Sequence, residues 1–223
     1  MHRIVLLGPP ASGKGTQGRL MIDRWRVPVV SAGDVLRSEI AAGTVLGQEA
    51  ARYMNDGSLV PDRVALASVE GWLDGHGDEF VFDGFPRTVG QAEALEAILV
   101  RRHSPLTAVL WLELAVSLIE HRVSRRVVCA DCGRSFQVGT HVPAKDAVCP
   151  VCGGMLAVRH DDDDPTKLAT RMIAYEKSTA PLMDYYEQRG LLRRIDAAQT
   201  PDEVFSQIET ATQAEVKTAV ANP

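Results

Sequence analysis

Short aliphatic runs, separated by longer stretches with helical periodicity, dominate the hydrophobic pattern of the chain. Five of these runs are bounded by Gly, Pro or polar residues and predict buried strands: Ile4–Leu7, Val27–Val30, Phe80–Phe82, Ala108–Leu114 and Leu192–Asp196. Patterns with a helical period lie between them: Gly13–Trp25, Thr88–Arg102 and Thr166–Gln188. Strands that alternate with helices predict an α/β fold, in which a parallel sheet is covered by helices on both faces.

Two segments interrupt this alternation. Residues 31–60 contain two short helical patterns broken at Gly43 and Gly57, and residues 129–158 consist of short extended pieces. Both segments are predicted to be insertions into the α/β core. Residues 211–223 have neither a turn signal nor a core pattern and predict a frayed helix or a tail.

Composition narrows the class of protein. The chain has 223 residues, of which 45% are hydrophobic and 24% charged, which is enough apolar material for one packed core with insertions. The apolar stretch Leu106–Ile119 contains Glu113 and is too short to span a bilayer, and Ile4–Leu7 is too short for a signal peptide. We therefore expect a cytoplasmic protein with no membrane partner. The net charge of −5 argues against nucleic acid as a partner.

The segment Gly8–Thr16, GPPASGKGT, follows the first predicted strand and opens the first predicted helix. It matches a phosphate-binding loop, G-x-x-x-x-G-K followed by a hydroxyl residue, with one Gly inserted before Thr16. Backbone N–H groups of such a loop surround phosphate oxygens, Lys14 neutralises the outer phosphates, and Thr16 reaches Mg²⁺ or a phosphate. Ala11 stands where many such loops have Gly, so the backbone there must tolerate a Cβ.

All four cysteines lie in two C-x-x-C-G pairs with sixteen residues between them: Cys129, Cys132, Cys149 and Cys152. Two such knuckles can hold Zn²⁺ tetrahedrally, and four protein ligands leave no open coordination position, so the metal would be structural. A redox pair or disulfide is the alternative, which the cytosol disfavours. A zinc ribbon can also bind nucleic acid, but the residues between the paired cysteines are not basic.

In this order and spacing, the motifs make the chain resemble the long form of the adenylate kinase family over about residues 1–210. The resemblance is carried by the phosphate loop, SAGDVLR at 31–37, DGFPRT at 83–88, Gln91, four arginines and the cysteine-bearing insertion. It implies a P-loop NTPase-type core with a doubly wound, five-stranded parallel sheet. It also implies the reaction MgATP + AMP ⇌ MgADP + ADP, with catalytic Mg²⁺ and a monomeric enzyme.

The implied organisation has a core, two mobile inserted segments and a tail. The core comprises residues 1–30, 61–121 and 160–216, the AMP-binding segment residues 31–60, the zinc-binding lid residues 122–159, and the tail residues 217–223. Closure of the two segments would exclude water, which otherwise competes with AMP for the phosphoryl group.

The acceptor in this reaction is a phosphate oxygen that is already anionic near pH 7. Catalysis therefore needs positioning and positive charge rather than a general base. The resemblance gives catalytic roles to these residues: Lys14, Asp83, Arg87, Arg122, Arg126, Arg159 and Arg171. Asp83, at the end of a predicted strand, is expected to hold water bound to Mg²⁺.

The two nucleotide sites follow from the same resemblance. The residues expected to bind ATP are Ala11, Ser12, Gly13, Lys14, Gly15, Thr16, Arg122, Arg126, Ser135, Phe136 and Gln199. Those expected to bind AMP are Ala32, Arg37, Ser58, Leu59, Val60, Gly84, Phe85, Pro86, Arg87, Gln91, Arg159 and Arg171. Gln91 fits the adenine-reading position, because its amide both donates and accepts.

Two alternatives remain open. Ala32 stands where the family often has Thr, and it leaves CMP or UMP as acceptors. The alternative of a different class is a non-catalytic P-loop switch, or a zinc protein that binds nucleic acid, which the GFPRT segment and the arginine set disfavour.

Overall fold

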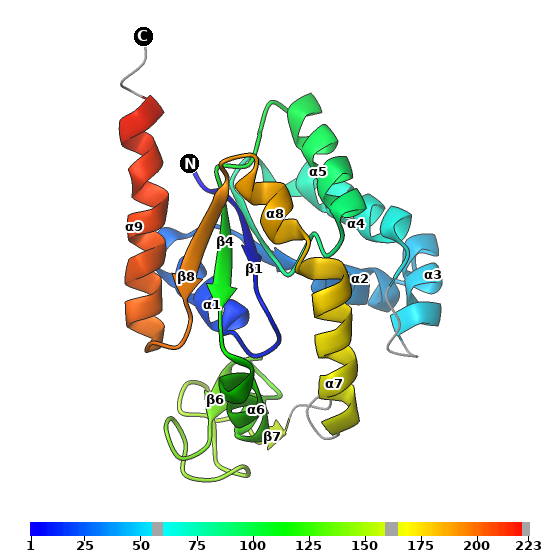
Figure 1. Ribbon diagram of the computed structural model, residues 1–223. Coiled ribbons are helices and arrows are strands. Elements are labelled where there is room, and N and C mark those ends of the chain that lie inside the picture. Colours follow the sequence, from blue (N-terminus) through cyan, green and yellow to red (C-terminus); the bar gives the residue numbers. More distant parts are fainter. Residues whose placement is uncertain (55–59, 159–164, 220–223) are drawn as a thin grey trace.

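The computed structural model describes residues 1–54, 60–158 and 165–219, and its larger part is a five-stranded parallel sheet (Figure 1). The strands in chain order are β1 (Arg3–Leu7), β2 (Val29–Ser31), β3 (Phe80–Asp83), β4 (Ala108–Glu113) and β8 (Leu192–Asp196). Their order in the sheet is β2-β3-β1-β4-β8. The five predicted strands are thereby confirmed. β2 begins two residues later than predicted, after Pro28, which has no N–H to donate to a ladder.

Helices surround this sheet. They are α1 (Lys14–Trp25), α2 (Ala32–Ala41), α3 (Val45–Met54), α4 (Asp62–His76), α5 (Val89–Arg101), α6 (Val116–Ser124), α7 (Pro165–Ala174), α8 (Leu182–Glu187) and α9 (Pro201–Ala219). The single helix predicted over Thr166–Gln188 is wrong: a π-helical turn at Tyr175–Thr179 and the following Pro181 divide it into α7 and α8. α9 continues to Ala219, so most of the segment predicted as a frayed helix or tail is helical.

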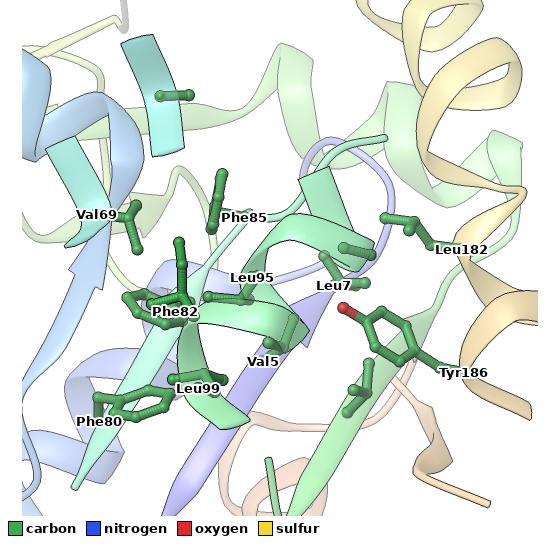
Figure 2. Packing of buried hydrophobic residues seen from close by; sticks show 14 of the residues in the cluster. Val5, Leu7, Val69, Phe80, Phe82, Phe85, Leu95, Leu99, Leu182 and Tyr186 are labelled. Carbon is green, nitrogen blue, oxygen red and sulfur yellow. The ribbon is translucent and has the colours of Figure 1, made fainter. Parts of the chain in front are cut away.

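The three central strands β1, β3 and β4 are buried on both faces, which is why they are nearly continuous apolar runs. Successive residues of β1 point to opposite faces. Val5 and Leu7 pack against α4, α5 and α8, whereas Ile4 and Leu6 pack against α1 and α9. Figure 2 shows the first of these clusters, with Leu95 of α5 directed toward the sheet. The prediction of helices on both faces is confirmed.

The strand order places β1 between β3 and β4, and the chain leaves β1 through α1 to reach the edge strand β2. In α/β sheets, ligands bind outside the carboxyl ends of the strands at such a reversal of strand order. The loop Gly8–Gly13 occupies this position, at the lower edge of the sheet in Figure 1.

The cysteine-bearing part of the chain forms a second, three-stranded antiparallel sheet below the carboxyl ends of the large sheet's strands (Figure 1). Its strands are β5 (Arg126–Cys129), β6 (Ser135–Gln137) and β7 (Leu156–Val158), with β5 in the middle. We call these strands and their connections the small sheet. The short extended pieces predicted here are confirmed, and α2 and α3 are the two helices predicted for residues 31–60. Among the described residues, no helix is both long and apolar enough to span a membrane.

Candidate active site

The loop between β1 and α1 adopts backbone conformations that suit glycine. Gly8 has φ 144° and Gly13 has φ 97°. A Cβ at Gly8 would lie 2.5 Å from the carbonyl oxygen of Leu112, so a larger residue would force a shift. Ala11 has φ 59°, in the left-handed region where a Cβ is strained. The inference that the backbone at Ala11 must accommodate a Cβ in a glycine position is confirmed.

Lys14 begins α1 and its side chain turns back over this loop. Its Nζ donates hydrogen bonds to the carbonyl oxygens of Gly8 and Pro9, both at 2.9 Å. Burial lowers the pKa of Lys14 to about 8, and the negative charge of Asp83 partly opposes this shift. Keeping this half-buried lysine protonated therefore costs desolvation free energy, and a bound anion beside it would offset that cost.

Four charged residues that are far apart in the sequence act electrostatically on Lys14: Asp83, Arg87, Arg126 and Arg171. They come from the end of β3, the loop after it, the start of β5 and α7. The three arginines lower the pKa of Lys14 further, beyond the effect of burial. The structure thus brings five of the seven predicted catalytic residues to one place. Arg159 lies outside the described residues.

Asp83 lies beside the first turn of α1. A Cβ added at Gly15 would be 3.9 Å from its Oδ2, and Thr16 is the next residue of that helix. Asp83 pairs in register with Leu6 of β1 and with Ser31 of β2, so the sheet fixes its position. A carboxylate and a hydroxyl near a phosphate loop are oxygen donors of the kind that Mg²⁺ takes.

Arg122, the seventh predicted catalytic residue, connects the phosphate loop to the loop after β8. Its Nη2 donates to the carbonyl oxygen of Ala197 at 2.7 Å, and its Nη1 lies 3.4 Å from that of Ala11. Burial lowers the pKa of Arg122, and Asp196 opposes this shift. Gln199, from the same loop, donates through its side chain to Asp196 at 3.0 Å.

The other predicted nucleotide site lies around the start of α2 and the loop after β3. Ser31 caps α2 by accepting from the backbone N–H of Asp34 at 3.0 Å. Asp34 forms an ion pair with Arg37, whose guanidinium lies over Gly33. On the loop after β3, the Nε of Arg87 donates to the carbonyl oxygen of Gly84 at 2.9 Å. Both predicted phosphate-holding arginines are exposed.

Gln91 is buried at 6% exposure, and its side-chain amide makes two hydrogen bonds. Its Oε1 accepts from the backbone N–H of Arg87 at 2.7 Å, and its Nε2 donates to Oδ1 of Asp62 at 2.7 Å. Thr88 caps α5 by accepting from the N–H of Gln91 at 3.1 Å, and its hydroxyl donates to Asp62 Oδ2 at 3.2 Å. An amide has two N–H donors and two lone pairs, so one of each remains for a ligand.

Several predicted contact residues are held by packing. Phe85 is 1% exposed and packs edge-on against Phe82, so its side chain belongs to the core. Ala32 packs against the same cluster and Val60 against a smaller one. On β6, Ser135 is exposed, whereas Phe136 packs within the small sheet. Ser58 and Leu59 lie outside the described residues.

The four cysteine sulfurs form one cluster, in which all Sγ atoms lie within 4.8 Å of one another. The Sγ atoms of Cys129 and Cys152 are 3.4 Å apart and those of Cys132 and Cys149 are 3.7 Å apart. A disulfide requires about 2.05 Å. Four thiolates at about 2.3 Å from a tetrahedral Zn²⁺ would be about 3.8 Å apart, so these residues fit a zinc ion.

The two cysteine pairs fold in the same way. In each, the first cysteine donates its N–H to a carbonyl five residues later, and the N–H four residues later donates back to that cysteine, within 3.0 Å. Gly133 and Gly153 have left-handed φ values of 68° and 79° at equivalent positions. Backbone hydrogen bonds lower the pKa of Cys149 to about 7 although burial alone would raise it. Nearby thiols raise that of Cys152 to about 12.

Sequence reasoning missed Asp62, Asp34 and Asp196, the carboxylates that hold Gln91, Arg37 and Gln199. A local signal exists for part of this arrangement, since Thr88-x-x-Gln91 follows the S/T-x-x-E/Q pattern of a helix start. Asp62 is 29 residues from Gln91, so its role depends on the packing of α4 against α5.

Comparison with known proteins agrees with this geometry. The family model described as adenylate kinase matches residues 6–191. Adenylate kinase from Acidothermus cellulolyticus is 43% identical over 211 residues, covering 94% of this chain and 97% of that protein. The Methanosarcina barkeri enzyme is 41% identical over 208 residues, covering 92% and 96%. The Clostridium tetani enzyme is 41% identical over 210 residues, covering 92% and 95%. With a phosphate loop, a converging set of arginines and relatives aligned along nearly their whole length, the chain belongs to the adenylate kinase family.

Proposed function

We propose that the protein transfers a phosphoryl group reversibly from MgATP to AMP, giving two ADP. The observation that carries this proposal is the convergence of Asp83, Arg87, Arg126 and Arg171 on Lys14 of the phosphate loop. Transfer between two phosphates concentrates negative charge on one small volume, and a set of cations from separate elements is suited to stabilise it.

In this proposal, each side chain has a role set by its position. Lys14 and the loop N–H groups hold the outer phosphates of ATP, and Arg122 fixes the loop to the segment that ends in Gln199. Arg37 and Arg87 hold the phosphate of AMP. Arg126 and Arg171, with Arg159 by resemblance, surround the transferring group. The acceptor oxygen is already anionic, so these residues position the reactants and balance charge without removing a proton.

Mg²⁺ is the ion expected with ATP. Asp83, through bound water, and Thr16 are the residues that would hold it beside the first turn of α1. When bound, the ion would neutralise charge on the phosphates and orient them for in-line transfer.

Zn²⁺ in the small sheet would act as a structural ion. The small sheet has a core of few buried apolar residues, including Val127, Val142 and Leu156, so a metal bound by all four cysteines would supply stability that packing cannot. We also propose that residues 31–60 and 122–159 are the segments that close over the nucleotides. A monomer in the cytoplasm, where thiols stay reduced, is part of the same proposal.

A panel of acceptors tests the reaction. The protein is incubated with MgATP and AMP, CMP, UMP or GMP, and nucleoside diphosphates are quantified. We expect AMP to give the highest kcat/KM, with Gln91→Ala lowering it for AMP most strongly. Preference for CMP or UMP would assign the alternative acceptor class that Ala32 leaves open. Absence of transfer to every acceptor would overturn the proposal.

A further inference from the structure

We propose that Asp62 is a positioning residue that fixes the orientation of the Gln91 amide, and thereby selects adenine over bases with an acceptor at position 6. This inference rests on the proposed function, because it assumes that Gln91 reads the acceptor base. Asp62 is the first residue of α4 and Gln91 lies in the first turn of α5. Their side chains are 2.7 Å apart at the hydrogen-bonding atoms.

The two hydrogen bonds of Gln91 permit only one orientation of its amide. Its oxygen faces a backbone donor, the N–H of Arg87, and its nitrogen faces an obligate acceptor, the Asp62 carboxylate. Rotation of the amide by 180° would set N–H against N–H at Arg87 and oxygen against carboxylate at Asp62. Each contact would then be repulsive, and at the buried Gln91 amide water cannot easily replace the lost hydrogen bonds.

Arg87 alone would not fix the amide as firmly, because it supplies only one of the two contacts. Asp62 is in turn held in place by the Thr88 hydroxyl, which donates to its second oxygen at 3.2 Å. Its carboxylate also lies at the N-termini of two helices, α4 and α5, whose unpaired N–H groups favour a negative charge there. The acceptor is therefore oriented and fixed between the two helices.

A fixed amide discriminates between bases by the polarity of their edges. Adenine presents an N–H donor at position 6, whereas guanine and hypoxanthine present a carbonyl oxygen. An amide that can present only one pattern leaves a mismatched base with an unpaired polar group, which is costly in a buried site. If the amide rotated freely, the protein would pair with either pattern and the preference would weaken.

The test compares AMP with IMP, which differ at this edge of the base, using kcat and KM of the full-length protein for each acceptor at saturating MgATP, and KM for ATP at saturating AMP. In Asp62→Ala we expect KM for AMP to rise about tenfold, as for loss of one hydrogen bond to a charged group. kcat and KM for ATP should change less than about threefold, and the ratio of kcat/KM for AMP over IMP should fall about tenfold. Asp62→Asn, which retains an acceptor oxygen, should restore this ratio to within about threefold of wild type.

Glu70→Ala is the matched control, because Glu70 also joins α4 to α5, through Arg101 at 3.0 Å. Equal effects of Asp62→Ala and Glu70→Ala would show loosening of the helix pair and overturn the positioning role. An unchanged AMP-to-IMP ratio in Asp62→Ala would do the same. If Asp62→Ala does not fold, Asp62→Ser, which is polar but too short to reach Gln91, takes its place with the same expected values. A wild-type protein that forms no ADP from ATP and AMP overturns the proposed function and this role together.

Discussion

Replacement of Lys14 by Met should stabilise the nucleotide-free protein while abolishing most of its activity. The pKa of Lys14 falls from its ordinary value of 10.5 to about 8, chiefly through burial. One pKa unit corresponds to about 1.4 kcal/mol, so the charged side chain costs the folded state up to about 3 kcal/mol. Solvent contact of the half-buried side chain, and loss of its hydrogen bonds to Gly8 and Pro9, reduce the expected gain to about 1–2 kcal/mol.

The stability that Lys14→Met gains over wild type should depend on pH in a defined direction. Below about pH 8 the lysine is protonated in both folded and unfolded protein, and the cost to wild type is complete. Between about pH 8 and 10.5 the unfolded chain binds the proton more tightly, so wild-type stability rises with pH relative to the variant. The excess stability of Lys14→Met over wild type is therefore greatest at pH 7 and below, and it decreases as the pH approaches 10.5.

Thermal unfolding without nucleotide measures the stability difference between Lys14→Met and wild type directly. Lys145→Met, which changes an exposed lysine of the small sheet, is the control. We expect Lys14→Met to raise Tm by about 2–8 °C at pH 7 and by much less at pH 10, and Lys145→Met to leave it unchanged. Added ATP should stabilise wild type but not Lys14→Met. Loss of a transition-state contact should lower kcat by about 10²–10³. A nucleotide-free Lys14→Met protein less stable than wild type at pH 7 would refute this electrostatic reasoning.

Three further predictions concern the loop, its arginine and the cysteines. Ala11→Gly should raise Tm by about 1–3 °C, because relief of the left-handed strain at Ala11 exceeds the added entropy of the unfolded chain; a lower Tm would contradict this. Arg122→Lys should raise KM for ATP about tenfold with little change in KM for AMP, because one ammonium cannot bridge the carbonyls of Ala11 and Ala197; steady-state kinetics with each nucleotide varied decides. Metal analysis should find one zinc per chain, lost together with several degrees of Tm in Cys129→Ser; metal-free wild type with free thiols would exclude the site.

Much of the fold follows from the sequence because local patterns and sheet burial agree. The strands β1, β3 and β4 are buried on both faces, so their aliphatic runs stand out, and Gly8 and Gly84 mark the loops that follow β1 and β3. The division of Thr166–Gln188 into α7 and α8 was not predicted, because a π-helical turn uses residues that fit a continuous helix equally well.

The candidate site was predictable where a motif has a local cause, and not where a side chain is held by a distant partner. The glycine-rich loop, the hydroxyl caps and the two cysteine knuckles depend on neighbours within six residues. The partners Asp62 for Gln91 and Ala197 for Arg122 lie 29 and 75 residues away. The packing of α4 against α5 brings the first pair together, and the pairing of β8 with β4 positions Ala197 for the second. No pattern within a single segment indicates such a pair.

The net charge of −5 conceals a site in which positive charges oppose one another. Arg87, Arg126 and Arg171 each lower the pKa of Lys14, whereas the carboxylate of Asp83 raises it. Two unit charges about 8 Å apart repel by about 2 kcal/mol at an effective dielectric constant of 20. The ion pair of Arg134 with Asp23, which joins the small sheet to α1 at 3.5 Å, is exposed and offsets at most about 1 kcal/mol. The positive charge of Arg126, at the start of β5, therefore opposes the proposed closure of the small sheet over the phosphate loop when no nucleotide is bound. Phosphates replace each repulsion by an attraction, so we expect nucleotide binding itself to supply the free energy that brings these elements together.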